Sequence, residues 1–125
     1  MLSGITFRIA TPSKILQTER VNKVVLPAYN GTVTILPKRA PSLFVLDCGL
    51  VKVLDENNKT LETFFVSGGV ADVAKDRCAI SAEIAINAYD YDLQSAQKEL
   101  AKQALSTAEK RFYEMIITYY QTNKK

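Results

Sequence analysis

The sequence predicts an α+β protein, with an antiparallel β-sandwich or flattened barrel over residues 1–87 and a C-terminal helical hairpin over residues 88–125. In the first part, short apolar runs of strand length are separated by frequent turn formers. In the second part, apolar residues recur at the three- and four-residue spacing of a helix, without glycine or proline. The length of 125 residues suits one small domain with an appendage.

The expected strands are residues 5–9, 14–17, 20–26, 33–35, 50–54, 60–66, 70–73 and 78–81. Residues 5–9 alternate, with the apolar side chains at odd positions. The polar turn formers at 55–59 join the strands on either side into a hairpin. Residues 67–69, Ser-Gly-Gly, break the next connection, and Lys-Asp-Arg at 75–77 turns the chain between the last two strands. Many short strands with such turns are typical of a sandwich or barrel.

Residues 25–41 form the most informative segment. The apolar run into Pro27 predicts a strand that ends there, because proline lacks the amide hydrogen that a ladder needs. Asn30-Gly31 supplies the positive φ of a tight reversal, and Pro37 ends the strand that follows. The result is a stiff loop with a polar tip. Since nothing in it can carry out chemistry, we interpret it as a docking surface.

The composition excludes several classes of function. The chain has no histidine, which removes the usual general base, the commonest zinc ligand and any Ser-His or Cys-His pair. Cys48 and Cys78 lie far apart in apolar runs, so we interpret both as small buried side chains rather than as a disulfide or metal site. We therefore expect no catalytic residue, metal or cofactor. The net charge of +3 comes from scattered basic residues, which argues against a nucleic-acid partner.

Helix signals begin after Asn87. Asp90 or Asp92 can cap a first helix, and a negative charge suits its N-terminal end. Ser106 and Glu109 stand at capping-box spacing, which predicts the start of a second helix. One continuous helix of roughly 30 residues is the alternative, because no glycine or proline enforces a break. The expected apolar faces are Leu93, Ala96, Gln97, Leu100 and Ala104, then Leu105, Ala108, Phe112, Met115, Ile116 and Tyr119.

A helical pair of this size is only marginally stable alone, so it must pack on itself, on the sandwich or on a partner. We interpret the aromatic residues Phe112, Tyr113, Tyr119 and Tyr120 as part of that packing rather than as a binding site. The hairpin is therefore the part of the protein that we expect to move.

Three motifs stand in order along the β region. The first comprises Leu26-Pro27, Gly31, Ile35-Leu36-Pro37 and Ala40-Pro41; the second is Leu-Asp-Cys-Gly-Leu-Val at 46–51; the third is Ser-Gly-Gly-Val-Ala-Asp-Val at 67–73. In register and spacing they resemble the epsilon subunit of F-type ATP synthases, whose patterns are roughly Leu-Pro-Gly-x-x-Gly-Glu-x-Gly-Ile-Leu-Pro-x-His-Ala-Pro, Leu-x-x-Gly-x-Val and Ser-Gly-Gly-x-x-Glu-Val. The resemblance spans almost the whole β region.

The resemblance implies a non-catalytic rotor subunit of the central stalk, which couples proton translocation through the c-ring to ATP synthesis. The sandwich would bind the gamma subunit and the polar loops of the c-ring. The helices would fold on the sandwich or extend along the shaft towards the alpha and beta subunits of the catalytic head, and so modulate hydrolysis. The implied c-ring interface is Tyr29, Asn30, Gly31, Thr32 and Arg39, and the implied gamma interface is Pro41, Ser42, Leu43 and Phe44.

Four residues of this segment depart from the family pattern: Ala28 and Thr34 stand where the family has glycine, and Thr32 and Arg39 alter the charge of the loop. Thr32 stands where the family has glutamate, which removes an acidic partner for a basic group on the ring. Arg39 replaces histidine and adds a guanidinium that can bind a carboxylate instead. We predict that the ring contact is retained with altered charge pairing; the alternative is that both are solvated loop residues.

The helical region departs as well. Residues 91–96 match the ATP-binding signature Ile/Leu-Asp-x-x-Arg-Ala of some family members, but Ser95 replaces the arginine. Serine cannot supply the charged fork of donors, so we expect no ATP binding and interpret Asp92 as a helix-start carboxylate. The basic residues of the regulatory helix, Lys110 and Arg111, are flanked by glutamates, which predicts weak or absent inhibition.

The N-terminal residues have neither the basic nor the apolar region of a signal peptide, and no apolar run approaches the roughly 18 residues of a membrane span. We therefore expect a peripheral subunit on the cytoplasmic face of the bacterial plasma (inner) membrane, without direct membrane insertion. The alternative function is a generic β-sandwich adaptor with a helical arm, outside the ATP synthase.

Overall fold

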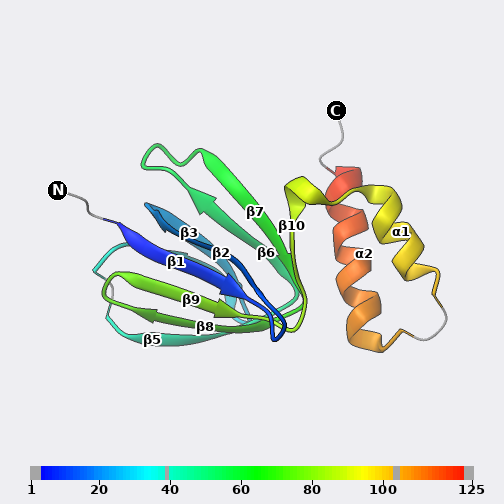
Figure 1. Ribbon diagram of the computed structural model, residues 1–125, viewed down its shortest axis with the longest axis horizontal. Coiled ribbons are helices and arrows are strands. Elements are labelled where there is room, and N and C mark those ends of the chain that lie inside the picture. The colour runs from blue at the N-terminus through cyan, green and yellow to red at the C-terminus, as the bar shows by residue number, and fades with distance from the viewer. Residues whose placement is uncertain (1–3, 39, 103–104, 123–125) are drawn as a thin grey trace.

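The computed structural model describes residues 4–38, 40–102 and 105–122, and Figure 1 shows a β-sandwich with two helices at one end. The strands are β1 (Ile5–Ala10), β2 (Ile15–Val21), β3 (Lys23–Ala28), β4 (Gly31–Ile35), β5 (Ser42–Leu46), β6 (Gly49–Leu54), β7 (Thr60–Val66), β8 (Gly69–Ala74), β9 (Arg77–Ser81) and β10 (Ala85–Asn87). The helices are η1 (Ala88–Asp90), a 3-10 turn, α1 (Leu93–Leu100) and α2 (Thr107–Thr122). The predicted α+β class and the helical hairpin are confirmed, and the single continuous helix is wrong.

One sheet folds over on itself to make the sandwich. Its strand order is β10-β7-β6-β3-β5-β8-β9-β1-β2, with β4 beside β3. Among the described strands the pairing is antiparallel except for β1 and β9, which run parallel. The antiparallel prediction is therefore wrong for that one pair. The two layers enclose an apolar core that includes Phe7, Leu26 and Phe64, each fully buried.

Two predicted strand boundaries are corrected. Residues 14–17 and 20–26 were expected as two strands divided before Arg20, but β2 runs unbroken to Val21 because it pairs along its length with β1, from Ile5–Val21 to Ala10–Ile15. Strand β3 does not end at Pro27, which pairs with Thr32 of β4. The proline lacks only the donor, and its carbonyl oxygen still accepts a hydrogen bond from the Asp47 N–H at 2.8 Å.

The predicted helix caps are confirmed. Asp92 caps α1, with its Oδ1 accepting from the Ser95 N–H at 2.8 Å. The Ser106 Oγ accepts from the Glu109 N–H at 3.1 Å, and the Glu109 carboxylate accepts from the Ser106 N–H at 3.0 Å, which completes the capping box. Those reciprocal bonds start α2 without a glycine or proline between the helices.

The helices pack on each other and on the outer face of the sandwich. A second apolar cluster joins Phe65 of β7 to Ala96 of α1 and to Phe112, Tyr113 and Ile116 of α2, all buried. The expected packing role of the aromatic residues is thus confirmed. On the predicted apolar faces, Gln97 and Ala108 are exposed, contrary to expectation, and Ala104 lies outside the described residues.

The two cysteines differ in their surroundings. Cys78 is buried in β9, as expected, and burial raises its pKa to about 12. Cys48 is only half-buried and lies in the connection between β5 and β6 rather than inside a strand. It packs against the second apolar cluster, around Phe65. Neither cysteine is in a disulfide.

Candidate functional site

The tip of the β3–β4 hairpin is the first candidate site. The chain reverses through Tyr29 and Asn30, and Gly31 follows with a φ of 124°, which suits glycine. The Tyr29 side chain is 70% exposed, and Asn30, Gly31 and Thr32 are exposed too. The predicted c-ring residues from Tyr29 to Thr32 therefore lie together on one rigid turn. Arg39, the fifth, lies outside the described residues.

The outer face of β5 is the second candidate site. Leu43 and Val45 point outward and are 69% and 58% exposed. Val45 lies opposite Val70 of β8, which is 38% exposed. Large apolar side chains gathered on an exposed sheet face are typical of a protein interface. Val45 and Val70 were missed from the sequence, although the alternation of residues 42–46 was a signal for Val45.

The other predicted gamma-interface residues are placed differently. Phe44 alternates to the inner face and packs, half-buried, against the core of the sandwich. Pro41 is exposed just before β5. Ser42 begins the strand half-buried, and its Oγ donates to the Ala40 carbonyl at 3.1 Å.

The tip and the β5 face form one continuous surface. The Tyr29 N–H donates to the Val45 carbonyl at 3.0 Å, which fixes the tip beside β5. Beyond Leu43, Asp72 lies opposite on β8 and pairs with Arg77 at 3.3 Å, with both side chains more than half exposed. An apolar centre with a charged rim is the usual anatomy of a protein–protein interface.

The two basic residues predicted for the regulatory helix, Lys110 and Arg111, have different surroundings. Lys110 is exposed on α2. Arg111 instead reaches the sandwich, where its Nη1 lies 3.2 Å from Asp47 Oδ1. The hydrogen bond from Arg111, followed by that from the Cys48 N–H, holds the pKa of Asp47 below its usual range. Asp92 is the N-cap of α1, and its hydrogen bonds with Ser95 lower its pKa.

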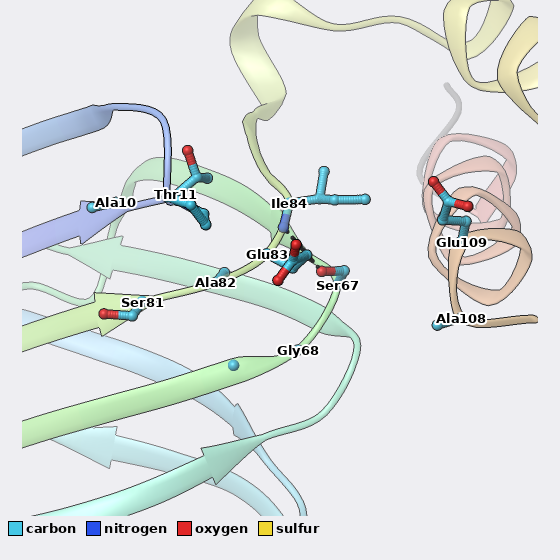
Figure 2. A pocket seen from close by; sticks show the side chains of 12 residues that line it. Ala10, Thr11, Ser67, Gly68, Ser81, Ala82, Glu83, Ile84, Ala108 and Glu109 are labelled. Carbon is cyan, nitrogen blue, oxygen red and sulfur yellow. Dashed lines mark hydrogen bonds between the residues drawn. The ribbon is translucent and has the colours of Figure 1, made fainter. Parts of the chain in front are cut away.

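A cavity of about 570 Å³ lies between the end of the sandwich and the first turn of α2 (Figure 2). Ser67, Gly68 and Ile84 line one side, and Ala108 and Glu109 face them from the helix. No basic side chain is among the lining residues, so this cavity is poorly suited to a phosphate. Within the described residues, no group of three or more potential metal ligands occurs. No described helix is long and apolar enough to cross a membrane.

Residues 4–88 match the family described as ATP synthase, Delta/Epsilon chain, beta-sandwich domain. The chain is 33% identical over 100 residues to the ATP synthase epsilon chain of Agrobacterium fabrum, covering 80% of this chain and 73% of that protein. It is 32% identical over 114 residues to the ATP synthase epsilon chain of Rhodospirillum rubrum, covering 91% and 81%.

Solved structures share the fold. A chain in the Euglena gracilis mitochondrial ATP synthase (OSCP/F1/c-ring) superposes with a TM-score of 0.69 at 17% identity, covering 98% of this chain and 84% of that chain. A chain in the central stalk/c-ring of the Tetrahymena thermophila mitochondrial ATP synthase gives 0.61 at 15% identity, covering 98% and 97%. The alternative of a generic adaptor outside the ATP synthase is therefore wrong. The chain belongs to the ATP synthase delta/epsilon chain family.

Proposed function

We propose that this chain binds the gamma subunit through the outer face of β5 and β8 and touches the polar loops of the c-ring through the β3–β4 tip. As an epsilon-type chain it is a non-catalytic, central-stalk subunit of the ATP synthase. In the proposed arrangement it helps to couple proton translocation through the ring to ATP synthesis in the catalytic head.

The observation that carries the gamma assignment is the exposed apolar patch of Leu43, Val45 and Val70. Strand β5 is held between β3 and β8, so the patch is presented by a rigid surface. Burial of such a patch on a coiled-coil shaft removes apolar area from water without any reordering of the sandwich. Phe44 contributes by packing beneath the patch rather than by touching the partner.

The tip suits a polar partner. Tyr29 offers an aromatic ring with a hydroxyl, and Asn30 and Thr32 offer hydrogen-bonding groups on a turn of fixed geometry. No acidic residue stands at position 32, so the ring contact relies on hydrogen bonds and on the charge of Arg39, whose structural placement is not described. This charge pairing differs from the family pattern.

Regulation by the helices is proposed to be weak. Arg111 is engaged by Asp47 on the sandwich, which leaves Lys110 as its exposed basic neighbour on α2. A helix that inhibits through contacts with the alpha and beta subunits would need more exposed positive charge than this. The chain is a peripheral subunit of a membrane complex, and we place it on the cytoplasmic face of the bacterial inner membrane because the curated relatives are bacterial.

The test of the gamma assignment is Leu43→Glu, with Leu61→Glu as the matched control. Both leucines are exposed, at 69% and 54%, but Leu61 lies on β7, outside the proposed interface. We expect Leu43→Glu to lower the amount of this chain that co-purifies with gamma by tenfold or more, and Leu61→Glu to leave it unchanged. Wild-type co-purification of Leu43→Glu would contradict the proposal.

A further inference from the structure

A second cavity, of about 540 Å³, lies among β7, the C-terminal end of α2 and the linker of residues 88–92, which joins β10 to α1. Three tyrosines line it: Tyr89 of the linker, and Tyr119 and Tyr120 of α2. Glu62 of β7 is the only charged side chain among the described lining residues. Cavities of this volume are typical of small-molecule sites. Aromatic rings together with a single carboxylate indicate a site for a cation.

Hydrogen bonds fix the carboxylate in the wall of this cavity. Asn87 Nδ2 donates to Glu62 Oε1 at 3.0 Å, and Asn87 Oδ1 accepts from the Tyr89 N–H at 2.8 Å. One amide therefore positions both the carboxylate of β7 and the backbone that carries the ring of Tyr89. Among the described residues, Glu62 Oε2 has no hydrogen bond or ion pair, so this oxygen remains available to a ligand.

The rings of Tyr119 and Tyr120 are held in place by the rest of the chain. The Tyr120 hydroxyl donates to the Tyr91 carbonyl at 2.6 Å and lies 3.2 Å from the Ala88 carbonyl. The ring of Tyr119 packs on Phe65, with 5.2 Å between the centroids. The centroids of Tyr119 and Tyr120 lie 5.3 Å apart, and their planes are inclined at 73°. Two fixed rings at nearly a right angle make a pre-organised aromatic corner.

Tyr89 differs from the other two tyrosines. Its side chain is 93% exposed, whereas Tyr119 and Tyr120 are half-buried. Its backbone is fixed by Asn87, but its ring can change rotamer without losing any packing in the core. Because the faces of aromatic rings attract cations, closing this third ring over a bound cation removes both from water and strengthens the attraction.

The lining favours a quaternary ammonium group over a primary amine. A primary ammonium has three N–H donors to satisfy, whereas Asn87 Oδ1 and the Ala88 carbonyl already accept hydrogen bonds within the chain. A trimethylammonium group needs no acceptor, and its methyl groups can pack on the rings. A phosphocholine headgroup is less suitable, because its phosphate would approach Glu62 and no basic side chain is among the described lining residues.

We propose that this cavity binds a small, free trimethylammonium compound of the choline type. Tyr89, Tyr119 and Tyr120 surround the methyl groups, and Glu62 balances the charge. The site lies apart from the surfaces proposed for gamma and for the c-ring, and it does not depend on either of them.

The experiment follows amide NMR spectra of the full chain during titration with choline chloride at constant total chloride. Two matched probes isolate the chemistry. Dimethylbutanol, the carbon analogue of choline, keeps the shape without the charge, and ethanolamine keeps the charge with N–H donors in place of methyl groups. We expect choline to shift the signals of Asn87, Tyr89 and Tyr119 and to bind at least about fivefold more tightly than either probe, as for one cation–π contact. Phosphocholine should also bind more weakly than choline.

Four variants test the residues. Tyr89→Leu keeps apolar bulk without the aromatic face and should weaken choline binding about fivefold, whereas Tyr89→Phe keeps the face and should bind as wild type. Glu62→Gln keeps an oxygen for Asn87 but removes the charge, and it should also weaken binding about fivefold. Its control is Glu56→Gln, in the exposed turn between β6 and β7, which should leave binding unchanged.

Several outcomes would overturn the proposal. Choline shifts that do not saturate, or equal affinity for either matched probe, would mean that the cavity does not recognise a quaternary ammonium group. Tighter binding of phosphocholine than of choline would assign the cavity to a lipid headgroup instead. Equal losses in Tyr89→Leu and Tyr89→Phe would contradict the role of the aromatic face, and unchanged binding in Glu62→Gln would contradict that of the carboxylate.

Discussion

Arg111 on α2 spans the boundary between helix and sandwich, and its Nη1 lies 3.2 Å from Oδ1 of Asp47. The same carboxylate accepts the Cys48 N–H at 2.8 Å, so Asp47 ties the β5–β6 connection to the helix above it. From the sequence, Arg111 is a candidate contact for the catalytic head, but in the structure it forms an ion pair with Asp47 of the same chain. The position of Arg111 accounts for the weak regulation that we propose.

The Asp47 contact makes part of the stability depend on pH. Its pKa is lowered in the folded chain, so its contribution is fully present above the unfolded value near 3.9 and is lost as the pH falls through the folded value. We expect Asp47→Asn to be less stable than wild type at neutral pH and to lose less stability between about pH 5 and pH 2. Urea unfolding midpoints across this range measure the effect. Asp76→Asn, in the exposed β8–β9 turn, is the control. Parallel wild-type and Asp47→Asn profiles would disprove the assignment.

The capping box at the start of α2 predicts a selective loss of helix stability. Ser106→Ala removes the acceptor for the Glu109 N–H and should lower the free energy of unfolding by about 1 kcal/mol. Glu109→Gln keeps an oxygen that can accept from the Ser106 N–H and should be close to neutral. Thermal unfolding followed by far-UV circular dichroism compares them. A loss in Glu109→Gln as large as that in Ser106→Ala would contradict this expectation and indicate that the charge of Glu109 contributes as much as the Ser106 cap.

Phe65 is the residue on which attachment of the hairpin depends. It is fully buried between β7 and the helices, so Phe65→Ala leaves a void of ring size and should cost about 3–5 kcal/mol at that interface. We expect the hairpin to become sensitive to limited proteolysis while the sandwich stays intact. Phe64→Ala, on the inner face of the same strand, should instead destabilise the sandwich. A protease-resistant hairpin in Phe65→Ala would refute this role.

The proposed ring contact has a matched pair of exposed tyrosines. Tyr29 is 70% exposed on the tip and Tyr89 is 93% exposed on the linker. We expect Tyr29→Ala to reduce retention of this chain on membranes that carry the c-ring by several-fold, because the tip loses its largest contact side chain, and Tyr89→Ala to be retained as wild type. The charged counterpart on the same loop is Arg39→Glu, which should also loosen attachment by reversing the charge. Full retention of both loop variants would show that the tip does not touch the ring.

Local signals in the sequence were enough for much of the fold. The turn at 55–59 and the capping box at Ser106 and Glu109 involve neighbours in the chain, so their chemistry is visible in the residue types. The parallel pairing of β1 with β9 could not be predicted, because it joins segments about 70 residues apart through backbone groups that every residue has. Strand β7 shows a related limit: Phe64 and Phe65 are buried on opposite faces, so its sequence does not alternate.

Only the part of the candidate site that depends on neighbours in the chain could be predicted from the sequence. The tip from Tyr29 to Thr32 is a local turn, and its exposure follows from that geometry. The apolar patch needs the pairing of Val45 with Val70, and the pair of Arg111 with Asp47 joins residues 64 positions apart. Neither relationship leaves a mark on residue spacing, so only the folded chain reveals them.

Two glycines with positive φ predict very different costs for the same substitution. Gly31 has a φ of 124° with nothing within 4 Å of an added Cβ, so Gly31→Ala carries only backbone strain, about 1–2 kcal/mol. Gly69 has a φ of 144°, and its added Cβ would lie 2.2 Å from the Ser81 carbonyl oxygen.

Because that oxygen is backbone in the neighbouring strand β9, it cannot swing aside, and β8 and β9 must separate to make room. We expect Gly69→Ala to lower the free energy of unfolding by more than about 4 kcal/mol, enough to prevent stable folding. Urea unfolding of the two variants decides the point. Similar losses at both positions would mean that backbone strain alone, rather than the approach of β9, requires glycine at position 69.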